Sequence, residues 1–424
     1  MDVTVRPSAP IRGRARVPGD KSISHRAAII GALASGVTRL RGFLHADDCR
    51  RTLDCLRVLG VRIEDAGAEL VIHGTTGCLS PPPSILDAGN SGTTMRLLCG
   101  VLAGQPFTAA IDGDASLRQR PMDRVAEPLR QMGAGVEARE GKFPPLRING
   151  GDLHGITYQL PVPSAQVKSA ILLAGLFARG DTVIIEPVPT RDHTERLLAG
   201  CGVPISREGS RVRLTPAVPQ GVTVEVPGDI SSAAFLLAAA AAIEDSDLVV
   251  EDVGLNPTRT GVLDVLRAMG AAVTTETVRG GPGEPVGTIS VRGRRLRGTT
   301  VAGELVPRVI DELPVLCVVA AAAEGRTVIR DAAELRVKES DRIGVLARGL
   351  RVLGASVVEH PDGMEIQGGR LRGGTVDAEG DHRLAMAFAV AGLFAEGPVT
   401  VRGAESVQIS FPGFFATLGT LRGA

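Results

Sequence analysis

A segment with the pattern of a helix, a glycine and then an extended stretch recurs along the chain. Five copies contain the strings LDCLRVLGVRIE, AEPLRQMGAGVE, TERLLAGCGVPI, LDVLRAMGAAVT and LARGLRVLGASVV, and a degenerate sixth, FFATLGTL, closes the chain. The glycines that mark the copies follow one another at intervals of 65 to 84 residues: Gly60, Gly133, Gly202, Gly270, Gly354 and Gly419. Glycine suits the position after a helix because it adopts the left-handed conformation without steric cost. The spacing predicts six α/β units of roughly seventy residues each.

A second repeat, Val-Pro-Gly-Asp, occurs at residues 17–20 and 226–229, each time directly before an alanine-rich apolar helix. Three of the predicted units lie between these turns and three follow the second turn, so we expect two domains of three units each. The predicted domains are residues 21–229 and residues 1–20 together with 230–424, and the chain crosses between them near 17–21 and 226–230. Two crossings at one seam would form a hinge beside a cleft, which is a common place for a ligand site.

The two turns differ in charge. The first is followed by Lys21, Ser22 and Arg26, whereas the second has Ile230 and Phe235 at positions equivalent to the two cations. Helix N-termini attract anions, so the first turn is a candidate seat for a phosphate or carboxylate. Taken alone, the stretch favours the simpler interpretation of an N-cap serine beside two solvated cations. The second turn is predicted to serve packing.

The composition limits the classes of protein to consider. Lysine plus arginine and aspartate plus glutamate both number 47, and this balance argues against a nucleic-acid or membrane-surface partner. The longest apolar runs are too short to span a bilayer, and the first residues lack the apolar core of a signal peptide. The six cysteines include no C-x-x-C pair, which is typical of reduced thiols. We therefore expect a cytoplasmic protein.

Several further stretches place polar residues where a strand is expected to lead into a helix. They are DAGNSGTTMRLL at 87–98, LRQRPMDR at 117–124, VPSAQVKSA at 162–170, PTRDHTERL at 189–197, RVIDELPV at 308–315, LRVKESDRIGVL at 335–346 and EGDHRLAMAFAV at 379–390. A capped turn, a solvated arginine run or a salt bridge would explain each one alone. All of them share one phase of the repeat, however, so helix N-termini that point at one cleft would gather them there. That pocket would be cationic with a few carboxylates for proton transfer, and it suits a small substrate with several anionic groups.

These stretches, in this order, resemble the enolpyruvyl transferase family. The matching pieces extend from residue 17 to residue 390, and the ordered set is specific although each piece is weak. The resemblance implies an α/β fold of two domains, each built from three βαβαββ units, with a cleft between the domains. The six units counted above agree with it independently.

The resemblance also implies an activity. We expect the chain to transfer the carboxyvinyl group of phosphoenolpyruvate to the 5-hydroxyl of shikimate 3-phosphate, with release of phosphate, on the route to chorismate and the aromatic amino acids. The reaction is addition followed by elimination through a tetrahedral intermediate, so it needs a base, an acid and strong anion binding. No metal or organic cofactor is expected, and the partners are the two small substrates, bound by a monomer.

Residue roles follow from the resemblance at matching positions. The residues expected to bind shikimate 3-phosphate are Lys21, Ser22, Arg26, Ser164, Ala165 (through its backbone), Gln166, Arg191, Asp311 and Lys338. Those expected to bind phosphoenolpyruvate are Lys21, Asn90, Gly92, Arg120, Gln166, Arg342 and Arg383. Asp311 is the expected base for the 5-hydroxyl, Glu339 is the expected proton donor to the vinyl carbon, and Lys21 is expected to reach both substrates. Glyphosate is expected to compete with phosphoenolpyruvate beside Gly92.

One position departs from the family pattern, and the sequence argues against two alternative assignments. Many relatives carry a lysine two residues before the C-terminal Phe-Pro, where this chain has Ile409; the remaining cations are expected to suffice. UDP-N-acetylglucosamine enolpyruvyl transferases usually carry a reactive cysteine five residues before the arginine of an Arg-Pro pair, where this chain has Ala115. A non-catalytic repeat scaffold would need neither Asp311 and Glu339 nor separated cations at equivalent helix starts.

Overall fold

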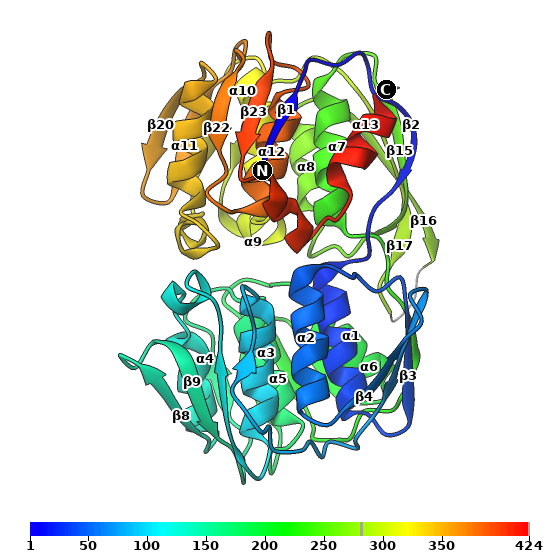
Figure 1. The fold of residues 1–424 in the computed structure, drawn as a ribbon, viewed down its shortest axis with the longest axis vertical. Coiled ribbons are helices and arrows are strands. Elements are labelled where there is room, and N and C mark those ends of the chain that lie inside the picture. The colour runs from blue at the N-terminus through cyan, green and yellow to red at the C-terminus, as the bar shows by residue number, and fades with distance from the viewer. Residues whose placement is uncertain (280–282, 423–424) are drawn as a thin grey trace. The chain divides into compact units, whose positions relative to one another are not determined.

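The structure is a computed structural model that describes residues 1–279 and 283–422, and Figure 1 shows its helices and strands. The chain forms two compact units. The unit that we call the terminal unit contains Met1–Pro18, Pro227–Gly280 and Pro285–Ala424, and the middle unit contains Gly19–Val226 and Gly281–Glu284. The chain therefore passes from the terminal unit to the middle unit after Pro18 and returns after Val226.

The middle unit holds three small sheets of four strands each. Their orders are β14-β3-β5-β4, β6-β7-β9-β8 and β10-β11-β13-β12. The strands are β3 (Val37–Arg41), β4 (Arg62–Asp65), β5 (Glu69–His73), β6 (Leu86–Asp87), β7 (Thr108–Asp112), β8 (Gly135–Arg139), β9 (Phe143–Asn149), β10 (Thr157–Gln159), β11 (Thr182–Ile185), β12 (Ile205–Glu208), β13 (Arg211–Leu214) and β14 (Thr223–Glu225). The helices are α1 (Lys21–Leu33), α2 (Asp47–Val58), α3 (Gly92–Ala103), η1 (Leu117–Gln119), α4 (Asp123–Gln131), α5 (Ala165–Gly175) and α6 (His193–Gly200).

The terminal unit repeats this plan. Its sheets have the orders β2-β15-β17-β16, β18-β19-β21-β20 and β22-β23-β1. The strands are β1 (Asp2–Val5), β2 (Arg12–Arg16), β15 (Asp247–Gly254), β16 (Ala272–Arg279), β17 (Val286–Arg292), β18 (Thr300–Val301), β19 (Arg326–Ile329), β20 (Ser356–His360), β21 (Gly363–Gln367), β22 (Gly374–Asp377) and β23 (Val399–Arg402). The helices are α7 (Ile230–Ala242), α8 (Gly261–Ala268), η2 (Gly303–Leu305), α9 (Val306–Val309), α10 (Leu313–Ala322), η3 (Ala333–Val337), α11 (Arg342–Val352), α12 (His382–Ala391), η4 (Ala404–Ile409) and α13 (Phe414–Leu421).

Each of the six sheets begins with a parallel pair and continues with antiparallel strands. The parallel pairs are β14 with β3, β6 with β7, β10 with β11, β2 with β15, β18 with β19 and β22 with β23. Parallel strands need a crossover connection, which a helix supplies, whereas antiparallel strands can follow one another directly. The α/β fold of six repeated units predicted from the sequence is confirmed.

Five of the six glycines that mark the repeat take the predicted left-handed conformation. Their φ angles lie between 79° and 111°, and each stands two positions after the last residue of a helix, in the order α2, α4, α6, α8 and α11. The prediction for the sixth is wrong, because Gly419 lies inside α13. No strand follows α13 among the described residues, so the chain has no reversal to make there.

The two Val-Pro-Gly-Asp turns lie at the two crossings. Strand β2 pairs with β15 in the terminal unit, yet α1, which follows the first turn, belongs to the middle unit. Conversely, β14 pairs with β3 in the middle unit, and α7, after the second turn, belongs to the terminal unit. Each turn ends in an aspartate that caps the helix: Asp20 accepts from the Ile23 amide at 2.9 Å, and Asp229 from the Ser231 amide at 2.8 Å.

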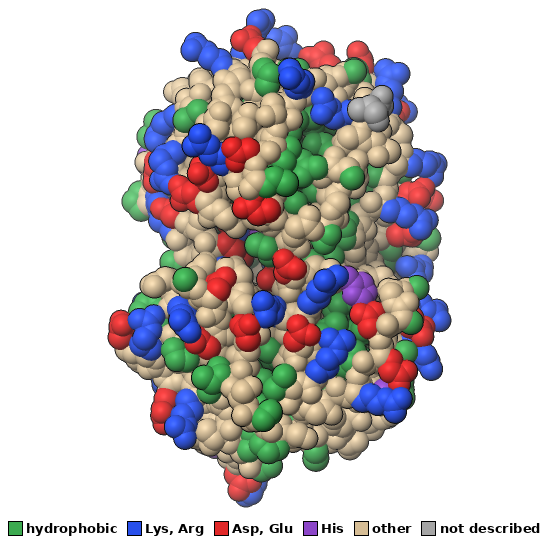
Figure 2. Space-filling model, in the orientation of Figure 1, with side chains coloured by type: hydrophobic (Ala, Val, Ile, Leu, Met, Phe, Trp, Pro, Cys, Tyr) green, Lys and Arg blue, Asp and Glu red, His purple; other side chains and the backbone are tan. Residues whose placement is uncertain are grey.

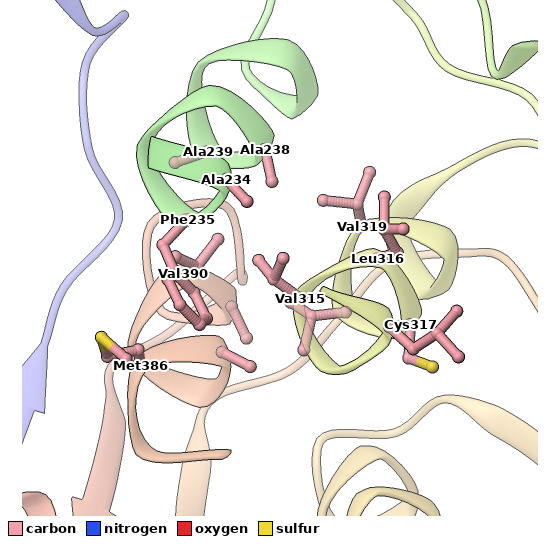
Figure 3. Close-up of a cluster of buried hydrophobic side chains, with 14 of the residues drawn as sticks. Ala234, Phe235, Ala238, Ala239, Val315, Leu316, Cys317, Val319, Met386 and Val390 are labelled. Atoms are coloured by element: carbon pink, nitrogen blue, oxygen red, sulfur yellow. The ribbon is translucent and has the colours of Figure 1, made fainter. Parts of the chain in front are cut away.

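Three apolar helices form the centre of the core in the terminal unit. Figure 3 shows side chains of α7, α10 and α12 packed together, with Phe235 beside Val390 and Met386. Every residue of α7 from Ile230 to Ala241 is buried, as expected of a helix that is apolar on all sides. Ile230 and Phe235 are each 1% exposed, so both serve packing. In the middle unit α1, α3 and α5 contribute to the core in the same way.

The face of the molecule drawn in Figure 2 carries side chains of both charges. Figure 2 shows lysine and arginine side chains interspersed with aspartate and glutamate over the face that it draws. Among residues 1–279 and 283–422, no helix is both long and apolar enough to cross a membrane.

Burial of the thiols predicts a simple labelling result. The pKa is raised by burial to about 12 at Cys55, Cys99 and Cys317 and to about 11 at Cys201, whereas Cys78 is exposed. Because the thiolate is the reactive form, Ellman's reagent at mildly alkaline pH is expected to label one thiol quickly in the folded protein and six in urea. Peptide mapping should place the fast label on Cys78. A second fast thiol in the folded protein would contradict this prediction.

Candidate active site

The N-terminal end of α1 brings together the polar residues of the first turn. Lys21 donates from Nζ to Oδ2 of Asp48, in the first turn of α2, at 2.8 Å. Arg26 is only 3% exposed, and it donates to Oγ1 of Thr194 at 2.8 Å, to Oγ of Ser169 at 2.9 Å and to the carbonyl of Ser22 at 3.0 Å. The simpler interpretation of two solvated cations is therefore wrong. Arg26 ties α1 to α5 and α6, and Lys21 ties α1 to α2.

The start of α3 forms a second polar group. Arg120 is 6% exposed and donates from Nη2 to Oδ1 of Asn90 at 2.6 Å and from Nη1 to the carbonyl of Asn90 at 3.2 Å. Gly92 is the first residue of α3, and a Cβ added there would lie 3.5 Å from Nη1 of Arg120. A bare glycine at a helix N-terminus beside a guanidinium is an arrangement that suits an anion.

Gln166 joins α5 to this group. Its Oε1 accepts from Nη1 of Arg96 at 2.7 Å, and its Nε2 donates to Oγ1 of Thr93 at 2.9 Å. Ser164 caps α5 by accepting from the Val167 amide at 3.4 Å, and Ala165 is the first residue of that helix. Arg191 is half-buried in the loop that leads into α6.

Sequence reasoning did not single out Arg96. It lies inside the quoted stretch 87–98, four residues after Gly92, and this spacing places both on one face of α3. A Cβ at Gly92 would lie 2.7 Å from Nη1 of Arg96. The four-residue spacing from Gly92 could therefore have identified Arg96 as a site residue, whereas no local motif indicated Asp48.

A buried hydroxyl chain links the same helix starts below the surface. Nδ1 of His25 lies 2.7 Å from Oγ1 of Thr52, which lies 2.7 Å from Oγ1 of Thr94. The pKa of His25 is lowered well below its ordinary value, chiefly by burial and further by the charges of Lys21 and Arg26. A neutral imidazole adds no charge to the site, so we assign this chain to holding α1, α2 and α3 together.

In the terminal unit, Arg342 at the start of α11 is surrounded by carboxylates. It is 1% exposed; Nε donates to Oδ2 of Asp381 at 2.7 Å, Nη2 donates to Oε2 of Glu339 at 2.5 Å, and Nη1 lies 3.6 Å from Oδ1 of Asp311. Burial alone would lower the pKa of Arg342, but the three carboxylates raise it by more than burial lowers it, so the net shift is upward. The guanidinium therefore stays charged and holds Asp311 and Glu339 in one place.

Arg383 and Lys338 complete this group around Asp311. Arg383, near the start of α12, donates from Nη1 to the carbonyl of Asp311 at 3.1 Å, and its Nη2 lies 3.6 Å from Oδ2 of the same residue. Burial lowers the pKa of Lys338, although the charges of Asp311, Glu334 and Glu339 oppose this shift. The terminal unit thus places a base candidate, an acid candidate and three cations within one cluster. Ile409 is the last residue of η4, outside these contacts.

Together, the fold and these groups define a class. Helix starts in both units carry buried guanidinium groups and glycine turns suited to phosphate and carboxylate, and one unit adds carboxylates for proton transfer. This is the make-up of an enzyme that transfers a group between small, multiply charged anions.

Comparison with known proteins identifies the family. The profile of the family described as EPSP synthase (3-phosphoshikimate 1-carboxyvinyltransferase) matches residues 5–418. The chain belongs to this family. The predicted resemblance and enzyme class, a transferase of the shikimate pathway, are therefore confirmed.

Individual relatives agree over the full length. The chain is 52% identical over 407 residues to 3-phosphoshikimate 1-carboxyvinyltransferase of Alkaliphilus metalliredigens, covering 95% of this chain and 96% of the relative. It is 54% identical over 422 residues to the protein of that name from Pelotomaculum thermopropionicum, covering 98% and 97%. The solved structure of EPSP synthase from Acinetobacter baumannii aligns with a TM-score of 0.88 and 46% identity, covering 99% of this chain and 98% of that chain.

Proposed function

We propose that this chain transfers the carboxyvinyl group of phosphoenolpyruvate to the 5-hydroxyl of shikimate 3-phosphate and releases phosphate. The observation that carries the proposal is the cluster in which Arg342 and Arg383 flank Asp311 while Arg342 also binds Glu339. It supplies one carboxylate for each of the two proton transfers and the cations that both substrates require.

In the proposed binding mode, the middle unit supplies most contacts to shikimate 3-phosphate. The residues that we assign to it are Lys21, Ser22, Arg26, Ser164, Ala165, Gln166 and Arg191, joined by Asp311 and Lys338 of the terminal unit. The position of the middle-unit residues supports this assignment: all of them except Arg26, which lies in the second turn of α1, stand at or next to the starts of α1, α5 and α6, where backbone amides favour anions.

Phosphoenolpyruvate is proposed to bind through Asn90, Gly92, Arg120 and Gln166 of the middle unit, Arg342 and Arg383 of the terminal unit, and Lys21. Each arginine pairs with carboxylate or phosphate oxygen through two N–H groups. Binding of this trianion would draw N–H groups of Arg342 away from Glu339. We propose that this exchange lets Glu339 hold the proton that it must donate.

The chemistry then follows in two steps. Glu339 gives its proton to the vinyl carbon while Asp311 removes the proton of the 5-hydroxyl, and the hydroxyl oxygen bonds to the central carbon to form the tetrahedral intermediate. In the second step Glu339 takes a proton back from the methyl group as the bond to phosphate oxygen breaks, and the proton that Asp311 removed passes to the departing phosphate. The guanidinium groups stabilise the charge that moves onto the phosphate.

A phosphate-release assay with two acceptors tests the proposal. With phosphoenolpyruvate present, we expect shikimate 3-phosphate to support release of one phosphate per enolpyruvyl ether formed and UDP-N-acetylglucosamine to support none. Phosphate release with UDP-N-acetylglucosamine but not with shikimate 3-phosphate would overturn the assignment of the acceptor. The monomeric state and the cytoplasmic location stay predictions of the sequence.

Lys338 predicts a pH dependence. Its ammonium must be charged to bind shikimate 3-phosphate, and its lowered pKa means that the charge is lost, as pH rises, before the ordinary value of a lysine is reached. We expect kcat/KM for shikimate 3-phosphate to fall on an alkaline limb with a midpoint below 10.5. In Lys338→Arg this limb should move to higher pH, because arginine keeps its charge. Identical alkaline limbs for both proteins would contradict this role.

A further inference from the structure

A buried ionic cluster lies beside Asp311 and uses residues that the mechanism above does not. Arg259 stands in the loop before α8, Ser231 is in the first turn of α7, and Glu312 directly precedes α10 without a capping hydrogen bond from its side chain. These residues are 1% to 3% exposed. The Ser231 hydroxyl donates to Oε1 of Glu312, Arg259 donates to the same hydroxyl, and Nη2 of Arg259 lies 3.3 Å from Oε1 of Glu312.

Filling this space with charged side chains is energetically unfavourable compared with filling it with apolar ones. Nη2 of Arg259 also lies 3.7 Å from Oδ1 of Asp229, so two carboxylates and one guanidinium are removed from water together. Apolar side chains of similar size would pack as well or better, because the loss of hydration of buried ions can exceed their mutual attraction. A cluster of this kind is therefore a candidate for a function in placing a group.

The group that it places is the residue next in the chain to Glu312. Arg342 and Arg383 hold the carboxylate of Asp311, and Arg383 also contacts its carbonyl. Glu312 fixes the backbone next to Asp311, because the Glu312 side chain is anchored to α7 and to the loop before α8. Asp311 is thereby clamped from α7, α11 and α12.

We propose that Ser231, Arg259 and Glu312 are positioning residues that aim the carboxylate of Asp311 at the hydroxyl it deprotonates. This inference rests on the role of Asp311 in the proposed function. In this proposal the second Val-Pro-Gly-Asp turn also helps to position Asp311, in addition to packing, since Asp229 ends that turn and Ser231 belongs to the helix that follows it.

The first test separates kcat from KM. None of the three residues is assigned to either substrate, so Arg259→Met is expected to lower kcat by roughly 10- to 100-fold, because a misplacement of about 1 Å can cost that much. KM for both substrates should change less than about threefold. Arg259→Lys keeps the charge and should recover most of kcat, and Ser231→Ala provides a milder variant if Arg259→Met folds poorly.

The second test uses two opposite charge changes. Arg342, Arg383 and Lys338 interact with the charge of Asp311, Glu339 shares Arg342 with it, and Glu312 is its neighbour in the chain. Glu312→Gln removes a negative charge and should move the acidic limb of the kcat–pH profile to lower pH, whereas Arg259→Met removes a positive charge and should move it to higher pH, each by roughly 0.5 pH unit. Substrate phosphates titrate alike for every variant, so only differences between variants count.

The control is Ser246→Ala. Oγ of Ser246 is 2.9 Å from the Ile11 amide that donates to it, and the residue is 2% exposed, beyond the other end of α7. It should lose stability with an unmoved kcat–pH profile. Profiles of Arg259→Met and Glu312→Gln that are likewise unmoved, with kcat lowered only in proportion to folded protein, would overturn the inference. Asp311→Asn separates the two levels: if it keeps full kcat, the base assignment fails and the inference falls with it.

Discussion

Glu339→Gln is expected to lower kcat by roughly 10²- to 10⁴-fold, the range that general acid–base catalysis commonly contributes. Glutamine matches glutamate in shape and its oxygen can still accept from Arg342, so the fold should be preserved. What it lacks is the ability to give the vinyl carbon a proton and retrieve it. Steady-state phosphate release at saturating substrates measures the effect, and circular dichroism with the thermal midpoint verifies the fold.

A matched substitution shows whether the loss is specific. Glu365 lies on β21 in the same unit, where Nη1 of Arg326 approaches its Oε2 at 3.0 Å on the surface. Glu365→Gln should change kcat less than twofold, in line with the small worth of surface ion pairs. Unchanged turnover in Glu339→Gln would remove the acid assignment while leaving the family assignment intact.

The largest effect on stability is expected from Lys168→Met. The Lys168 side chain is fully buried in α5, with Nζ 3.1 Å from Oε1 of Glu186 and 2.6 Å from Oε1 of Glu195. Methionine fills the space but leaves both carboxylates without the buried ammonium; Arg207 remains, 3.0 Å from Oε2 of Glu186 and 3.8 Å from Oε1 of Glu195. Removing one partner of a buried pair costs about 3–5 kcal/mol, so the free energy of unfolding of the middle unit should fall by about that amount in urea.

Two companions make this measurement decisive. Lys142→Met removes an exposed lysine of the same unit and should change the free energy of unfolding by less than about 0.5 kcal/mol. Adding Glu195→Gln to Lys168→Met should restore part of the loss, because one uncompensated charge is removed. A loss below about 1 kcal/mol in Lys168→Met would show that the cluster is solvated.

How far the sequence could predict the molecule depended on the range of the interaction. Positions governed by neighbours along the chain were predictable: Gly60 and Gly354 end their helices because a left-handed residue is needed directly after them. The prediction for Gly419 failed because the same local pattern occurs there within a helix, with no strand after it in the described part of the chain. The helix-start residues of the site were likewise recognised from local motifs and their order.

Contacts between residues that are far apart in the sequence could not be predicted from it. Lys21 and Asp48 are 27 positions apart, Arg96 and Gln166 are 70 apart, and Ser231 and Glu312 are 81 apart. Local spacing carries no information on which distant side chain will lie opposite. The local sequence of the second turn shows only its apolar residues, because Glu312, which accepts the hydrogen bond of the Ser231 hydroxyl, lies directly before the distant helix α10.

The separation of β2 from α1 at the first crossing bears on how the chain folds while it is being made. Synthesis runs from the N-terminus, so β1 and β2 emerge before the strands with which they pair: β2 pairs with β15 at 247–251, and β1 pairs with β23 at 399–402. The middle unit needs almost nothing beyond Val226. It can therefore fold first, while β1 and β2 await partners. Arg12, Arg14 and Arg16 alternate along β2, and charged side chains on an unpaired strand disfavour its pairing with another chain.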